Sequence, residues 1–205
     1  MEKILYIFIT HKKNIENTHK RVTVMMQNVD NSNYVIVQGG SDINYYDIDL
    51  KILYINSNDT YEGLPEKVLK SYKYIVENEI FDEYTHFIKL DDDMIIKNYI
   101  SYDLIKSLNY AGKVFDGIGD RAWHIGKCSK DNIWNSTHYS GIYTSWCLGG
   151  FGYIISRYSI NLIKNDTTYN NAIYEDLYIA LLLKNNNITP ININTKNLFI
   201  SPTHK

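Results

Sequence analysis

The chain has 205 residues, of which 44% are hydrophobic and 21% are charged, and its formal net charge is −2. This length suits one domain with a core of its own, so we expect residues 1–205 to form a single domain. A near-neutral charge provides no basic field for a phosphate backbone, which disfavours nucleic-acid binding. With 14% aromatic residues, the chain is also too rich in core-forming side chains to be disordered as a whole.

The first residues and the two cysteines indicate in which cellular compartment the protein is expected. The apolar run at 4–10 is too short to span a membrane, and no small-residue cleavage site follows it. We therefore expect a buried strand there, with no signal peptide and no membrane span. Cys128 and Cys147 make neither a disulfide framework nor a zinc site with close-spaced ligand pairs, and we expect free thiols. These features predict a soluble, cytoplasmic protein.

Apolar, β-branched runs alternate with segments of helical periodicity, which is typical of an α/β fold with a mainly parallel central sheet flanked by helices. In chain order, the predicted elements are strand 3–10, helix 15–28, strand 34–38, strand 51–55, helix 66–79, strand 84–90, helix 98–109, an irregular segment at 110–148, strand 152–156, helix 158–165, helix 175–184 and an extended tail at 188–205.

Three aspartates, Asp91, Asp92 and Asp93, directly follow the predicted strand 84–90. In open α/β sheets, ligands bind beyond the carboxyl ends of the strands. Because side chains alternate along a strand, we expect Asp91 and Asp93 to face one pocket while Asp92 faces away. Two convergent carboxylates suit a hard divalent cation that also binds phosphate oxygens. The alternative is a solvated acidic turn, but the apolar runs on both sides of the triplet argue against it.

Two further motifs each have a functional and a structural interpretation. Gly149, Gly150 and Gly152 would let the backbone approach a ligand closely, or they form a tight turn between packed elements. Glu175 and Asp176 begin a predicted helix, where acidic residues complement the helix dipole. One of these two carboxylates would act as a general base if it projected into the same cleft as the triplet.

Single histidines and the end of the first strand are weaker signals. His204, near the C-terminus, matters only if the tail folds back over the predicted metal site. Thr10 and His11 end the first strand and are candidates for contacts with a nucleotide. His86, inside a predicted strand, is expected to belong to the core.

The three tryptophans, Trp123, Trp134 and Trp146, are open to two interpretations. They stack on sugars or they pack in the core, and the core is the more frequent place for such side chains.

Four motifs occur in an order that resembles the β-1,3-galactosyltransferase and Fringe type of GT-A glycosyltransferases. They are NDTYEGLPEK at 58–67, FIKLDDDMII at 87–96, LGGFGYIIS at 148–156 and EDLY at 175–178. Each motif alone is modest in specificity, but four in one order with sensible gaps rarely arise by chance. The resemblance extends over most of 1–205 and is poor between 110 and 148. It implies a GT-A (Rossmann-like) fold.

The resemblance implies roles for the acidic residues and the terminal histidine. Asp93 would be the main protein ligand of Mn²⁺ (or Mg²⁺). Asp91 would lie near the ribose and the metal, and Asp92 near the donor sugar. His204 would be a second metal ligand. Asp176 would be the catalytic base.

The same resemblance implies contacts around the two substrates. Gly149 and Gly150 would shape the floor under donor and acceptor. Thr10 and Arg21 would lie where the first strand and the following helix approach the nucleotide. Lys67 matches a helix lysine of the family, for which a structural role is open.

The reaction implied is transfer of a hexose or N-acetylhexosamine from a UDP-sugar to an acceptor hydroxyl on a glycan or glycoprotein, with inversion at the anomeric carbon. Two other classes stay open. A metal-dependent nucleotidyltransferase acting on sugar phosphates also uses paired carboxylates, although HKKN after the first strand lacks the expected glycines. A noncatalytic module that binds UDP-sugar or glycan would keep the fold without turnover.

Overall fold

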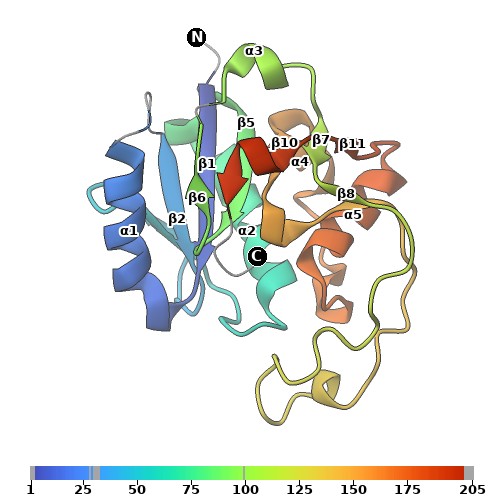
Figure 1. Ribbon diagram of the computed structural model, residues 1–205. Coiled ribbons are helices and arrows are strands. Elements are labelled where there is room, and N and C mark those ends of the chain that lie inside the picture. Colours follow the sequence, from blue (N-terminus) through green and yellow to red (C-terminus); the bar gives the residue numbers. More distant parts are fainter. Residues whose placement is uncertain (1–2, 28, 30–32, 99, 201–205) are drawn as a thin grey trace.

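A computed structural model describes residues 3–27, 29, 33–98 and 100–200. Its centre is an eight-stranded sheet with the order β11-β7-β10-β5-β1-β2-β4-β3 (Figure 1). The strands are β1 (Lys3–Thr10), β2 (Tyr34–Gln38), β3 (Tyr45–Asp47), β4 (Ile52–Tyr54), β5 (Tyr84–Asp91), β7 (Tyr110–Gly112), β10 (Tyr153–Ser156) and β11 (Ile191–Asn192). Only the pairings made by β10 and β3 are antiparallel. The predicted α/β fold with a mainly parallel sheet is therefore confirmed.

Helices cover both faces of this sheet. They are α1 (Ile15–Gln27), α2 (Leu64–Glu77), α3 (Tyr102–Ile105), α4 (Arg157–Ile163) and α5 (Glu175–Asn185). One core cluster contains side chains of α2, α4 and α5, and a second contains side chains of α1 and α3. The two clusters lie on opposite faces of the sheet.

Strand β1 shows why the sequence folds in this way. Its odd-numbered side chains Leu5 and Ile7 belong to one core cluster, and its even-numbered Tyr6 and Phe8 belong to the other. A strand that is apolar at every position has no face for solvent and must lie inside the sheet between two helical layers. The continuous run at 4–10 accordingly forms a central strand.

Two small antiparallel pairs lie outside the main sheet. Strand β6 (Ile95–Ile96) pairs with β12 (Phe199–Ile200), and β8 (Val114–Phe115) pairs with β9 (Trp146–Cys147). The first pair brings the end of the described chain back to the segment that follows the aspartate triplet. The second pair closes the base of the irregular segment, which extends as a long loop at one end of the molecule (Figure 1).

Apart from the helix at 98–109 and the tail, the predicted strands and helices agree with the structure to within two residues at each end. The helix predicted at 98–109 is wrong, because only Tyr102–Ile105 is helical before the chain enters β7. The segment buries Ile100 and Ile105, and their spacing of five residues does not match the helical period. Helix α2 begins at Leu64, two residues before the predicted start, because Pro65 fits the first turn.

The predicted tail at 188–205 is extended only in part. It contains β11 and β12, with a 3-10 turn at Thr195–Asn197 between them. Residues 201–205 lie outside the described part of the chain, as does residue 28 at the end of the first predicted helix.

Two smaller expectations can be checked here. Cys128 and Cys147 are free thiols, as expected. Within the described ranges, every helix is too short or too polar to cross a membrane.

Candidate active site

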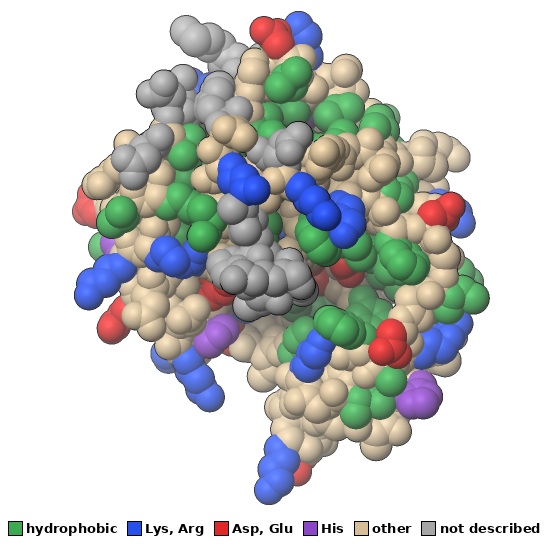
Figure 2. Space-filling view, viewed as in Figure 1, with side chains coloured by type: hydrophobic (Ala, Val, Ile, Leu, Met, Phe, Trp, Pro, Cys, Tyr) green, Lys and Arg blue, Asp and Glu red, His purple; other side chains and the backbone are tan. Residues whose placement is uncertain are grey.

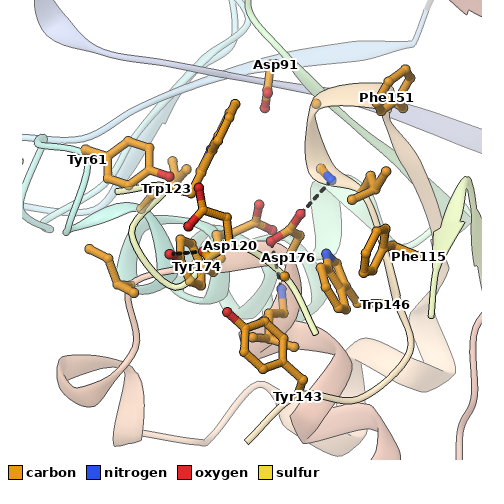
Figure 3. A pocket seen from close by; sticks show the side chains of 18 of the residues that line it. Tyr61, Asp91, Phe115, Asp120, Trp123, Tyr143, Trp146, Phe151, Tyr174 and Asp176 are labelled. Carbon is orange, nitrogen blue, oxygen red and sulfur yellow. Dashed lines mark hydrogen bonds between the residues drawn. The ribbon is translucent and has the colours of Figure 1, made fainter. Parts of the chain in front are cut away.

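A cavity of about 530 Å³ opens beside the carboxyl end of β5 and the start of α5. Figure 2 shows a hollow on this face that is bordered mostly by hydrophobic side chains. The aromatic residues of the cavity wall are Tyr61, Phe115, Trp123, Tyr143, Trp146, Phe151 and Tyr174. Its ionisable side chains other than tyrosines are Lys89, Asp91, Asp120, Glu175 and Asp176. The cavity thus combines an apolar wall with several carboxylates (Figure 3).

Asp176 is half-buried in the first turn of α5 and is held by two backbone amides. The Gly149 N–H donates to its Oδ2 at 2.9 Å, and the Leu177 N–H donates to its Oδ1 at 2.8 Å. Desolvation by the surrounding protein raises the pKa of Asp176 above its ordinary value, against the opposing effect of these hydrogen bonds. The carboxylate is therefore fixed in orientation and more basic than an exposed aspartate.

Gly149 and Gly150 lie in a 3-10 turn, Gly149–Phe151, that forms part of the cavity wall. A Cβ on Gly149 would come within 3.3 Å of the Asp176 Cβ. The absence of a side chain lets the turn approach α5 closely enough for its amide to reach the carboxylate.

Lys89 pairs with a carboxylate at the end of β5 and with another at the start of α5. Its ammonium lies 2.6 Å from Asp91 Oδ1 and 3.1 Å from Glu175 Oε2, and the side chain is 1% exposed. Burial acts to lower the pKa of Lys89, but the carboxylates of Asp91 and Glu175 outweigh it and raise that pKa. Asp91 at the end of β5 is thereby tied to the first residue of α5.

Glu175 continues this buried chain of polar contacts. The Tyr153 hydroxyl donates to its Oε1 at 2.5 Å, and the Tyr72 hydroxyl donates to that of Tyr153 at 2.8 Å. Desolvation raises the pKa of Glu175, partly offset by Lys89. The sequence predicted that one of these two carboxylates projects into the cleft. In the structure, Asp176 accepts hydrogen bonds from the backbone amides of Gly149 and Leu177, whereas Glu175 pairs with the Lys89 ammonium.

The aspartate triplet divides as strand alternation predicts for its first two members. Asp91 reaches the cavity, whereas Asp92 points toward α1. Its Oδ2 accepts hydrogen bonds from Thr10 Oγ1 at 2.6 Å, Asn14 Nδ2 at 2.6 Å and Thr18 Oγ1 at 3.2 Å. These contacts give Asp92 a structural role between β1 and α1, and none of them supports the position near the donor sugar that the resemblance implies.

The prediction that Asp93 faces the same pocket as Asp91 is wrong for this cavity, because Asp91 lines its wall and Asp93 does not. Strand β5 ends at Asp91, so the alternation of side chains stops before Asp93, which lies half-buried in the following turn. His204 is outside the described residues.

Thr10 is buried, and His11 is exposed just beyond β1. Arg21 donates from Nη1 to the carbonyl of Met94 at 3.0 Å and so supports the turn after the triplet.

Lys67 supports the end of β1 from the other side. Its ammonium donates to the Thr10 carbonyl at 2.9 Å and to Asp59 Oδ1 at 2.6 Å. The Lys12 N–H donates to Asp59 Oδ2 at 2.6 Å. A structural role for Lys67, which the sequence left open, agrees with these contacts.

Sequence reasoning missed Asp120 and most of the aromatic wall, which come from the irregular segment. The available signal was the richness of 110–148 in Trp and Tyr. The tryptophans were expected either to stack on sugars or to pack in the core. Trp146 is buried in the cavity wall, and Trp134 packs inside the protein, edge-on against His124 with 5.4 Å between the ring centroids. Trp123 lines the cavity and is 56% exposed.

Glu62 clamps this segment to the rest of the protein. Its carboxylate accepts hydrogen bonds from the backbone N–H of Ser129 at 3.2 Å, from the Ser129 hydroxyl and from Asn132 Nδ2 at 3.1 Å. Partial burial acts to raise the pKa of Glu62, but the hydrogen bonds from Ser129 dominate and lower it. The contacts join the 58–67 motif to the wall on the opposite side of the cavity.

Replacing Glu62 by alanine is expected to loosen the segment around Lys127 and Lys130. Loss of hydrogen bonds to a charged acceptor costs about 1–2 kcal/mol at a half-exposed site. Because local opening precedes cleavage, trypsin should cut there about tenfold faster. Limited proteolysis followed by mass spectrometry measures this rate. Glu16→Ala, at an exposed position on α1, is the control, and equal digestion of the two variants would contradict the clamp.

A cavity with an aromatic wall lies at the carboxyl end of the parallel strand β5, next to Asp91, which is the edge of an α/β sheet where ligands generally bind. The family described as Galactosyltransferase matches residues 41–194. The chain belongs to this family and is a glycosyltransferase, as its motifs predict.

The solved structures to which the chain is similar include the following two. One is a putative glucose-1-phosphate thymidylyltransferase from Bacillus anthracis in complex with a sucrose, with 12% identity, a TM-score of 0.49 and coverage of 94% of this chain and 87% of that chain. The other is A197 from STIV, with 12% identity, a TM-score of 0.49 and coverage of 99% and 92%. No curated protein matches the chain.

Proposed function

We propose that this glycosyltransferase moves a hexose or N-acetylhexosamine from a UDP-sugar to an acceptor hydroxyl on a glycan or glycoprotein, with inversion and with a divalent cation. One observation carries the proposal: Asp91 from β5 and Asp176 from α5 open onto the same cavity and are linked through Lys89 and Glu175. A transfer reaction requires that donor and acceptor are held in a fixed geometry, and protein groups fixed relative to each other provide it.

The donor side of the proposal is the edge that contains Asp91 and Asp93. Mn²⁺ or Mg²⁺ would take carboxylate oxygens there and complete its coordination with water and phosphate oxygens. Among the described residues, no group of three His, Cys, Asp or Glu side chains could hold a metal ion, so the donor diphosphate would have to supply ligands. Pairing of β12 with β6 sets Ile200 opposite Ile95, two residues beyond Asp93. His204, which is outside the described residues, is proposed as a further ligand from the resemblance alone. Bound there, the cation would offset the negative charge that develops on the departing diphosphate.

The acceptor side depends on Asp176. Its carboxylate takes the proton of the acceptor hydroxyl as that oxygen bonds to the anomeric carbon and the bond to the β-phosphate oxygen breaks. The amides of Gly149 and Leu177 orient the carboxylate, and desolvation raises its pKa, which makes the carboxylate a better base. Attack from the face opposite the diphosphate inverts the anomeric centre.

The test is UDP release from a panel of UDP-sugars with Mn²⁺, with EDTA, and with the Asp93→Ala variant. We expect slow hydrolysis of one donor that requires the metal and falls about 10²-fold or more in the variant. Asp49→Ala, at an exposed turn, is the matched control. UDP binding without release from any donor would favour a binding module, and pyrophosphate release from a sugar phosphate and a nucleoside triphosphate would favour a nucleotidyltransferase.

A further inference from the structure

We infer that the buried His124 is a pH-sensitive switch for the cavity wall: its protonation directs the Tyr174 hydroxyl to the Asp120 carbonyl, which ties the wall to the start of α5, and loss of the proton releases this tie. The inference goes beyond the proposed reaction and does not depend on it. His124 belongs to the irregular segment between β8 and β9, whose residue Asp120 lines the cavity next to Tyr174 (Figure 3).

Both ring nitrogens of His124 have a partner, and the side chain is fully buried. Nε2 lies 2.9 Å from the carbonyl oxygen of Thr137, and Nδ1 lies 2.8 Å from the hydroxyl of Tyr174. The same hydroxyl donates to the carbonyl oxygen of Asp120 at 2.8 Å. Tyr174 directly precedes Glu175, the first residue of α5, so this contact joins the cavity wall to that helix.

The hydrogens in these contacts can be assigned from the chemistry of the partners. A carbonyl oxygen only accepts hydrogen bonds, so the Thr137 contact requires a hydrogen on Nε2 of His124. A neutral imidazole then has no hydrogen on Nδ1. Desolvation raises the pKa of the Tyr174 hydroxyl, which therefore keeps its one hydrogen at neutral pH. That hydrogen has two acceptors at the same distance, Nδ1 and the Asp120 carbonyl.

The two protonation states of His124 use this hydrogen differently. With a neutral ring, it goes to Nδ1, because a buried nitrogen without a donor costs more than the carbonyl of Asp120, an exposed residue that can turn to water. With a protonated ring, Nδ1–H donates to the Tyr174 oxygen, whose own hydrogen points to Asp120, and all three contacts are satisfied. Proton uptake therefore closes the link between Asp120 and α5, and proton loss opens it.

The groups in contact with His124 are uncharged at neutral pH. Trp134 packs against its ring edge-on with 5.4 Å between the centroids, and Tyr174 does so at the same separation. The Cys128 thiol donates to the backbone carbonyl of His124, and burial raises the pKa of that thiol. Along the described ranges, no carboxylate is hydrogen-bonded to the ring. His124 therefore lacks the ion pair that would keep a buried imidazolium permanently charged.

Charged side chains of both signs lie around these neutral contacts. They are the carboxylates of Asp120 and Glu62, which act on Tyr174 and Cys128, and the cations of Arg121 and Lys127, which lie over aromatic rings of the cavity wall. Because both signs are present, their effects on the ring oppose each other. The hydrogen-bond partners of the ring therefore decide which state the wall adopts.

The experiment follows the full chain from about pH 5 to about pH 8, the range in which histidines commonly titrate. We expect ¹⁵N NMR spectra to show a hydrogen on both ring nitrogens of His124 at the acidic end and on Nε2 alone at the alkaline end. Hydrogen exchange, corrected for the intrinsic rate, reports on the amides at 118–126. These should be about fivefold better protected in the protonated state, the effect of one hydrogen bond on local opening.

Tyr174→Phe removes the hydroxyl and keeps the ring. In this variant, protection at 118–126 should be the same at both ends of the pH range and as low as in the wild type at the alkaline end. His138→Gln, at an exposed position of the same segment, is the matched control and should keep the wild-type pH dependence. The inference is overturned by a His124 ring that holds the same number of hydrogens throughout, by wild-type protection that does not change with pH, or by a pH dependence that persists in Tyr174→Phe.

Discussion

Replacing Asp176 by asparagine is expected to lower the transfer rate by about 10²–10⁴-fold, the contribution of a positioned general base. Asparagine has the same shape, and its one carbonyl oxygen can accept from either the Gly149 or the Leu177 amide, which now donate to different oxygens. The other amide loses its partner at a cost of about 1 kcal/mol, so the fold should persist. It cannot take up the acceptor proton. The measurement is kcat for transfer, with UDP affinity determined separately to show that the donor still binds.

The matched control is Asp131→Asn, which removes an exposed carboxylate from the irregular segment and should leave kcat unchanged. Undiminished turnover in Asp176→Asn would exclude Asp176 as the base. The pH profile gives an independent check. Because desolvation raises the pKa of Asp176, the ionised fraction falls at a higher pH than for an exposed aspartate. The wild-type rate should therefore decline as pH falls through that raised pKa, and the residual rate of the variant should lack this decline.

The fold was predictable from the sequence where a segment carries its own pattern. Residues 4–9 are apolar at every position, and Tyr84, Phe87, Ile88 and Leu90 supply apolar positions within 84–90; each segment forms a central strand. The two-residue strands β6, β8, β9 and β12 are too short to show any period. Each exists because a distant partner pairs with it, as β12 does with β6, and such pairing cannot be read from local sequence.

The site was predictable to a similar extent. Position at a strand end pointed to Asp91, position at a helix start pointed to the pair Glu175 and Asp176, and the resemblance chose Asp176 from that pair. Strand alternation turned Asp92 away but wrongly set Asp93 in the pocket. Asp120 and Trp123 were not predicted as a pair, because their positions depend on distant contacts such as the clamp made by Glu62. Lys89 did leave a signal, since a lysine inside a buried strand requires a charged partner.

Replacing Lys89 by methionine is expected to destabilise the protein by about 3–5 kcal/mol, the cost of removing one member of a buried ion pair. Methionine fills a similar volume but leaves Glu175, which is 4% exposed, without its cation. Urea denaturation measures the loss as a lower midpoint. Lys106→Met is the control, because Lys106 pairs with an exposed aspartate at the surface and its replacement should leave the midpoint unchanged.

The double variant Lys89→Met with Glu175→Gln distinguishes a lost charge pair from lost packing. If the cost arises from an uncompensated carboxylate, the second substitution should restore part of the stability at neutral pH. Burial already raises the pKa of Glu175, and loss of Lys89 raises it further. A raised carboxylate pKa favours the folded state below the unfolded pKa and loses that benefit as pH rises, so the deficit of Lys89→Met should shrink as pH falls. A deficit that is independent of pH and unaffected by the second substitution would assign the loss to packing, and Lys89 would then not be the electrostatic link between Asp91 and the start of α5.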